Sequence, residues 1–102
     1  MNDPPVWQHH NPKWLLHDAS RYFAKRPWLE TAIANCKAAL WESSAYVYFV
    51  DPTNANKVGS LWQFDFNLQI ENTRHGNLVL DILKDKQIGG IEFLDRLDDN
   101  PL

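Results

Sequence analysis

Histidines, carboxylates and one cysteine are the residues of this 102-residue chain that could take part in chemistry at neutral pH. His10, His17 and His75 could act as acid and base on a phosphate held by Lys13, as in a small ribonuclease. They fall on different expected elements, and no sequence spacing brings them together. His9 and His10 are adjacent, so their side chains diverge in an extended segment, and a metal site would need a third ligand. We therefore expect a protein that is not an enzyme, with no catalytic residue, no metal and no cofactor.

The single cysteine, Cys36, lies in a stripe of apolar residues with Leu29, Ile33 and Leu40, at the spacing of one helix face. A thiol in such a stripe is expected to be a buried structural group rather than a nucleophile. One cysteine excludes an internal disulfide framework and fits a reducing compartment. The N-terminal residues hold no apolar signal-peptide core, and no apolar run has the roughly 18 residues of a membrane helix. We expect a cytoplasmic protein without membrane contact.

Length and charge indicate which kind of partner the chain could bind. Residues 1–102 are expected to form one domain, which can bury a core but not a deep catalytic cavity as well. The net charge of −3 argues against binding to a phosphate backbone and suits a basic partner. These features indicate a protein partner, and neither nucleic acid nor a small-molecule substrate.

Residues 61–94 are the stretch around which the rest of the chain is organised. Apolar and polar residues alternate over 61–71, which is typical of a strand with one buried face. Turn residues follow, and then come two further strands over 78–84 and 88–94, joined by Asp85 and Lys86 as a two-residue turn. The aromatic and β-branched residues 45–50 predict another strand.

Two amphipathic helices are expected before these strands. The first should span residues 12–24, with Asn11 as its N-cap, and the second residues 27–41. Because helices with one apolar stripe and a sheet with one apolar face must cover each other, the predicted fold class is α+β. It has two N-terminal helices packed on one face of a four-stranded antiparallel sheet. Residues 1–10 should be an extended segment, and residues 95–102 an acidic tail.

The alternation also fixes the pairing of the strands, since a slip by one residue would turn a whole apolar set to water. The expected pairs are Leu78 with Phe93, Leu80 with Ile91, Ile82 with Gly89, Leu68 with Leu80, and Phe66 with Ile82.

The same register predicts a mixed outer face on the sheet, which is acidic and, through Val79, Leu83 and Ile88, partly apolar. Asp65, Asp81 and Glu92 fall there, and Gly90 leaves room beside Asp81. Tyr46 and Tyr48 join this face if the intervening Val47 enters the core. We predict that the partner-binding residues are Tyr46, Tyr48, Asp65, Asp81 and Glu92. The alternative is that this is an ordinary solvated sheet face.

Three segments carry a family resemblance: YVYFVDP at 46–52, WQFDFNLQIE at 62–71 and GNLVLDILKDKQIGGIEFL at 76–94. Over residues 46–102 the chain resembles the immunity proteins of bacterial contact-dependent growth inhibition. The resemblance implies a protein that binds a cognate toxin C-terminal domain delivered by a neighbouring cell, often a nuclease, and neutralises it in the cytoplasm. It implies no enzyme activity, and no family residue is transferred to this chain by position.

Other functions remain open from the sequence. A ribonuclease-like enzyme would use the histidines named above, and a single-stranded nucleic-acid module would stack bases on exposed aromatic residues. Both would need affinity for polyanions, which the scattered lysines and arginines do not favour. A generic protein-interaction subunit is a further alternative.

Overall fold

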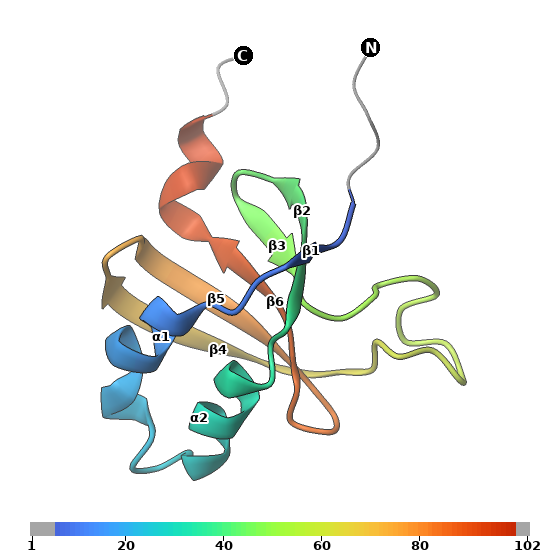
Figure 1. Ribbon diagram of the computed structural model, residues 1–102, viewed down its shortest axis with the longest axis horizontal. Coiled ribbons are helices and arrows are strands. Elements are labelled where there is room, and N and C mark those ends of the chain that lie inside the picture. Colours follow the sequence, from blue (N-terminus) through green and yellow to red (C-terminus); the bar gives the residue numbers. More distant parts are fainter. Residues whose placement is uncertain (1–5, 100–102) are drawn as a thin grey trace.

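The computed structural model describes residues 6–99, so the first half of the segment 1–10 and the end of the tail 95–102 lie outside the described residues. The elements, in chain order, are β1 (Gln8–His9), α1 (Lys13–Asp18), the 3-10 helix η1 (Ser20–Tyr22), α2 (Pro27–Ala34), β2 (Ala38–Ser43), β3 (Tyr46–Tyr48), β4 (Phe64–Thr73), β5 (Gly76–Leu83), β6 (Ile88–Phe93) and the 3-10 helix η2 (Leu94–Asp99). The strands form one antiparallel sheet of six, in the order β1-β2-β3-β6-β5-β4 (Figure 1).

Strands β4, β5 and β6 follow the alternation of the sequence. The pairs Leu78–Phe93, Leu80–Ile91, Leu68–Leu80 and Phe66–Ile82 are confirmed. The side chains of Leu68, Ile70, Leu78, Leu80, Ile82 and Ile91 are buried together in the core. Burial of one apolar face therefore decided this part of the fold, as the pattern predicted.

The turn between β5 and β6 differs from the prediction, and it shifts the pairing of Ile82. The backbone N–H of Leu83 donates to the carbonyl of Gln87 (2.9 Å), so the turn holds three residues, and Lys86 has a φ of 68°. A two-residue turn of the usual type needs two left-handed residues, whereas this loop needs one. Ile82 consequently pairs with Ile88, and the predicted partner Gly89 is an extra residue in β6.

The predicted helix over 27–41 is wrong beyond its first eight residues, because α2 ends at Ala34. The next segment, β2, pairs with β3 on one side and with β1 on the other. Ala, Leu and Trp in this segment are compatible with a helix as well as with a strand. Pairing decided the outcome, because without β2 the strand β3 would expose one row of backbone groups.

The first predicted helix is also shorter than expected, and Asn11 has another role. Helix α1 ends at Asp18 and is followed by the single turn η1. The side chain of Asn11 does not cap α1; its Nδ2 donates to the carbonyls of Ile33 (2.9 Å) and Cys36 (2.7 Å) at the end of α2. One amide group thereby connects the segment that leads into α1 with the C-terminal end of α2 and the residues just after it.

The fold is mostly sheet, which corrects the prediction of four strands under two long helices. Helices α1 and α2 lie on the same side of the sheet, with α1 over β4 and β5 and α2 beside β4, toward the β5–β6 turn (Figure 1). Leu15, Leu29 and Ile33 from the helices are fully buried and belong to the same core as the strands. Cys36, at 5% exposure, is buried with them, and burial raises its thiol pKa to about 12. A structural rather than a nucleophilic thiol fits this environment.

Candidate functional site

The outer face of the sheet brings four of the five predicted site residues together. Tyr46 in β3 is the direct cross-strand partner of Glu92 in β6. One step along, Gly90 in β6 lies between Tyr48 on β3 and Asp81 on β5. Since side chains alternate along a strand, these residues point away from the buried Val47 and Ile91.

Gly90 permits the closest contact in this cluster. A Cβ at this position would stand 2.6 Å from the carbonyl oxygen of Val47 and 2.9 Å from Oη of Tyr46. The phenol of Tyr46 therefore lies across the glycine, and its hydroxyl donates a hydrogen bond to the carboxylate of Asp81. The ring of Tyr48 packs edge-on against that of Tyr46, with centroids 4.7 Å apart.

The protonation of this group follows from its burial. Partial burial raises the pKa of Asp81, and the hydrogen bond from Tyr46 acts in the opposite direction. Burial also raises the pKa of Tyr46, and the hydrogen bond to Asp81 and the charges of Asp81 and Glu92 add to this effect. At neutral pH the phenol thus keeps its proton, and the hydrogen bond fixes the ring in one orientation.

Sequence reasoning missed a third carboxylate, Glu42, because residue 42 follows a segment expected to be a helix. It lies on β2, and its Oε2 accepts a hydrogen bond from the hydroxyl of Tyr48 (2.9 Å). Burial and this bond raise the pKa of Tyr48. We call the group Glu42, Tyr46, Tyr48, Asp81 and Glu92 the acidic face.

No carboxylate of the acidic face forms an ion pair in the part of the chain that the structure describes. The two ion pairs among those residues, Asp18–Arg74 and Asp65–Lys86, both lie elsewhere. Beyond Tyr48, the buried ring of Trp62 closes one end of the face, with its centroid 5.7 Å from that of Tyr48. A surface of aromatic rings surrounded by carboxylates is suited to bind a basic protein.

The fifth predicted residue, Asp65, is not part of this cluster. It lies at the irregularity of β4 between Phe64 and Phe66, and its carboxylate is 3.8 Å from Nζ of Lys86. That ammonium group also lies over the ring of Phe66, 5.0 Å from its centroid, and over the ring of Trp28 on α2. Asp65 therefore faces Lys86 instead of the two tyrosines.

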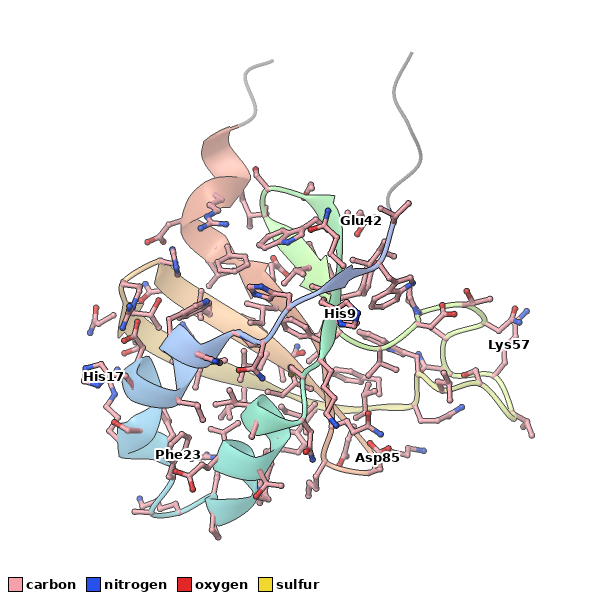
Figure 2. All side chains as sticks on the ribbon, viewed as in Figure 1. His9, His17, Phe23, Glu42, Lys57 and Asp85 are labelled. Atoms are coloured by element: carbon pink, nitrogen blue, oxygen red, sulfur yellow. The ribbon has the colours of Figure 1, made fainter. Side chains whose placement is uncertain are left out.

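Two of the three histidines that could serve as acid and base lie at one cavity, and the third lies elsewhere. His17 is exposed on α1, well away from β1, where His9 lies (Figure 2). His10 and His75, in contrast, line one cavity together with Arg96. The sequence carries no signal for this, because the three residues come from the segment after β1, the β4–β5 turn and η2.

Among the side chains of residues 6–97, no three from His, Cys, Asp or Glu are grouped as a metal ion would require. None of the helices described has both the length and the apolar character for crossing a membrane. Family models, curated protein sequences and solved structures gave no match to this chain. The resemblance of residues 46–102 to immunity proteins stays a prediction.

Proposed function

We propose that this protein is an immunity protein, which binds a basic toxin domain and covers the surface with which that domain holds its substrate. The observation that carries the proposal is the acidic face, where two tyrosines and three carboxylates meet on adjacent strands without an ion-pair partner among the described residues. The resemblance of residues 46–102 supports the toxin as partner. The site of action would be the cytoplasm.

The chemistry of a nuclease explains why such a face would inhibit it. A nuclease needs lysines and arginines where it holds phosphate groups, and their positive field attracts an acidic protein during the diffusional approach. Tyrosines contribute large contact areas at interfaces and lose little conformational freedom on binding. The hydrogen bond to Asp81 already fixes the side chain of Tyr46 in the free protein. Binding therefore costs less conformational entropy at this residue.

The first experiment is to purify the tagged protein from its native host and identify what binds to it in a stoichiometric complex. The expected partner is a basic domain whose nuclease or growth-inhibiting activity is suppressed by this protein and returns when the protein is removed. Failure of every candidate toxin domain to bind would overturn the proposal.

The second experiment tests the acidic face on that complex. The double variant Glu42→Lys and Glu92→Lys should slow association at least about tenfold and weaken its dependence on salt. Glu30→Lys is the matched control, because Glu30 is exposed on α2. Equal association rates for the double variant and the wild type would show that another surface binds the toxin.

The enzyme and nucleic-acid alternatives are separated by a simpler test. Both require binding to RNA or another polyanion at low salt, whereas an immunity protein does not. We expect no retention on a polyanion column at low ionic strength.

A further inference from the structure

A cavity of about 230 Å³ opens on the same side of the sheet as the helices. Helix α1 covers β4 and β5 and α2 lies beside β4, while the strand β3 and the end of β6 are covered mainly by the segment that leads from β1 into α1 (Figure 1). This thinner cover leaves the cavity, which we call the aromatic pocket. The residues that matter for its chemistry are His10, Trp14, Trp41, His75, Phe93 and Arg96.

Flat rings form the walls of the aromatic pocket. Trp41 and Phe93 are stacked, with centroids 5.6 Å apart and planes 20° from parallel. Trp14, from α1, lies 6.3 Å from Phe93 and meets the ring of His75 edge-on at 4.5 Å. Trp41 is 37% exposed, so this wall can be reached from solvent. Such walls favour a planar ring over a branched aliphatic group.

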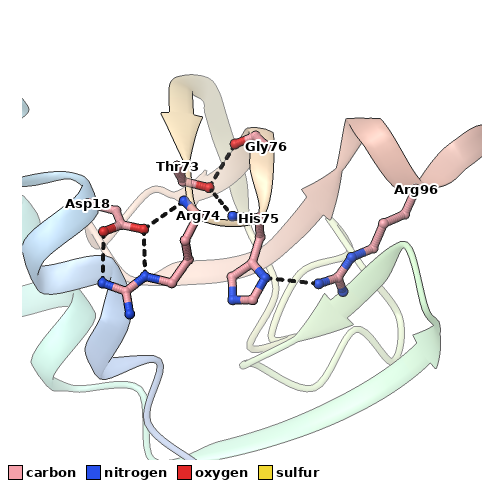
Figure 3. Close-up of polar contacts among 6 residues, drawn as sticks. All are labelled: Asp18, Thr73, Arg74, His75, Gly76 and Arg96. Atoms are coloured by element: carbon pink, nitrogen blue, oxygen red, sulfur yellow. Dashed lines mark hydrogen bonds and ion pairs between the residues drawn. The ribbon is translucent and has the colours of Figure 1, made fainter.

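One end of the aromatic pocket is cationic. The guanidinium of Arg96 lies 4.1 Å from the centroid of Phe93 and donates to the carbonyl of Ser44 (3.0 Å). Its other terminal nitrogen is 3.2 Å from Nδ1 of His75 (Figure 3). Burial, and then the charges of Arg96 and Arg74, lower the pKa of His75, so the imidazole is neutral at pH 7 and Nδ1 accepts this bond.

These contacts leave part of the guanidinium available. An arginine has five N–H donors, and two are used by Ser44 and His75. Among the side chains of residues 6–97, no carboxylate forms an ion pair with Arg96 within 4 Å. A guanidinium stacked on a ring, with donors to spare, is suited to hold a planar carboxylate through paired hydrogen bonds.

We propose that the aromatic pocket binds a small planar aromatic carboxylate, with its ring against Trp14, Trp41 and Phe93 and its carboxylate on Arg96. The cavity is smaller than the roughly 300 to 1,000 Å³ of sites for drug-sized ligands, so it fits one ring with its substituents and not a nucleotide. The positive end disfavours a cation. The pocket lies on the opposite side of the sheet from the acidic face, so this site does not depend on the toxin partner.

Three probes of one shape test the charge preference in the wild-type protein. Benzoate, benzamide and benzamidine are planar and nearly identical in size, and they are anionic, neutral and cationic at pH 7. We expect benzoate to bind at least about tenfold more tightly than benzamide, and benzamidine to bind most weakly. NMR titration should show the largest shifts at the indole N–H groups of Trp14 and Trp41.

The variant Arg96→Gln should lower the affinity for benzoate to that for benzamide. Arg21→Gln is the matched control, because Arg21 also lies over an aromatic ring, that of Tyr22 at 5.1 Å, and donates to a backbone carbonyl. It should leave benzoate binding unchanged. Benzamidine binding as tightly as benzoate, or benzoate shifts confined to residues outside the pocket, would overturn the proposal, and neither result depends on the folding of a variant.

Discussion

Replacing Tyr46 with phenylalanine isolates the hydrogen bond at the centre of the acidic face. The ring and its packing against Tyr48 stay, and only the donor to Asp81 is lost. Both partners are half-buried, so the carboxylate of Asp81 would be left without its donor and with little access to water. Hydrogen bonds to charged groups contribute about 1.5–3 kcal/mol, and we expect the free energy of unfolding to fall by about 2 kcal/mol at pH 7.

Tyr48→Phe provides the matched control within the same strand. Its hydroxyl donates to Glu42, which is exposed, so water can replace this hydrogen bond. This variant should lose less than about 1 kcal/mol. Urea denaturation followed by tryptophan fluorescence gives both values, and for a domain of this size each kcal/mol corresponds to about 4–8 °C in Tm.

The effect of Tyr46→Phe should depend on pH in a defined direction. The pKa of Asp81 is raised in the folded state, so the folded protein binds this proton more tightly than the unfolded chain does. Protonation of Asp81 therefore stabilises the fold at low pH, and this stabilisation is lost as the pH rises through the folded-state pKa. Once Asp81 is protonated, the bond from Tyr46 joins two neutral groups and is weaker. The loss caused by Tyr46→Phe should therefore shrink in acid. Equal losses for the two tyrosine variants at pH 7 would refute this account.

Three further predictions, two on substitutions and one on thiol reactivity, test other parts of the fold. Arg74 donates to the carboxylate of Asp18 and lowers its pKa to about 2, so the resulting stability is present above the ordinary value of 3.8 and lost as the pH falls toward 2. Asp18→Asn should flatten the acid titration of stability in that window. Gly90→Ala should destabilise the fold by about 1–3 kcal/mol in urea denaturation, because the new Cβ would meet the carbonyl of Val47. Cys36 should react with a thiol reagent only as fast as the protein opens, since burial raises its pKa and hides it; rapid reaction in native buffer would contradict its place in the core.

The strands β4, β5 and β6 were predictable because their pattern is local and strict. A period of two places Leu68, Leu80 and Ile91 on one face, and burial of that face fixes the register without knowledge of the rest of the chain. The same register placed Asp81 beside Gly90 and Glu92 beside Val79, so the core of the acidic face followed from it.

The extent of helix α2 was not predictable from local signals. Leu29, Ile33, Cys36 and Leu40 keep helical spacing past the point where the helix ends, and Ala38 and Ala39 favour a helix. The strand forms because β3 and β1 lie on either side of it, which is a long-range fact. Glu42 was missed for this reason.

The aromatic pocket was also beyond sequence reasoning, which expected no small-molecule substrate and did not look for a site for one. Its residues come from five places along the chain, and no periodicity relates Trp14, His75 and Arg96. Contacts between α1, β2, β6, η2 and the β4–β5 turn bring them together, and the segment before α1 adds His10. His10 and His75 were expected on different elements, and they are, but the fold brings both to the lining of this cavity.

The position of β6 between β3 and β5 has a consequence for the order of assembly. Tight turns join β4 to β5 and β5 to β6, so these three strands can pair through short loops. The pairing of Val47 with Ile91 closes a much longer loop and comes at a greater entropic cost. We expect the amides of β5 and β6 to exchange with deuterium only on global unfolding, and those of the two-residue edge strand β1 to exchange first. The acidic face combines residues of β5 and β6, which we expect to pair first, with residues of β2 and β3, which we expect to pair later. It is therefore complete only in the fully folded domain, and a partner that binds it would bind only fully folded molecules.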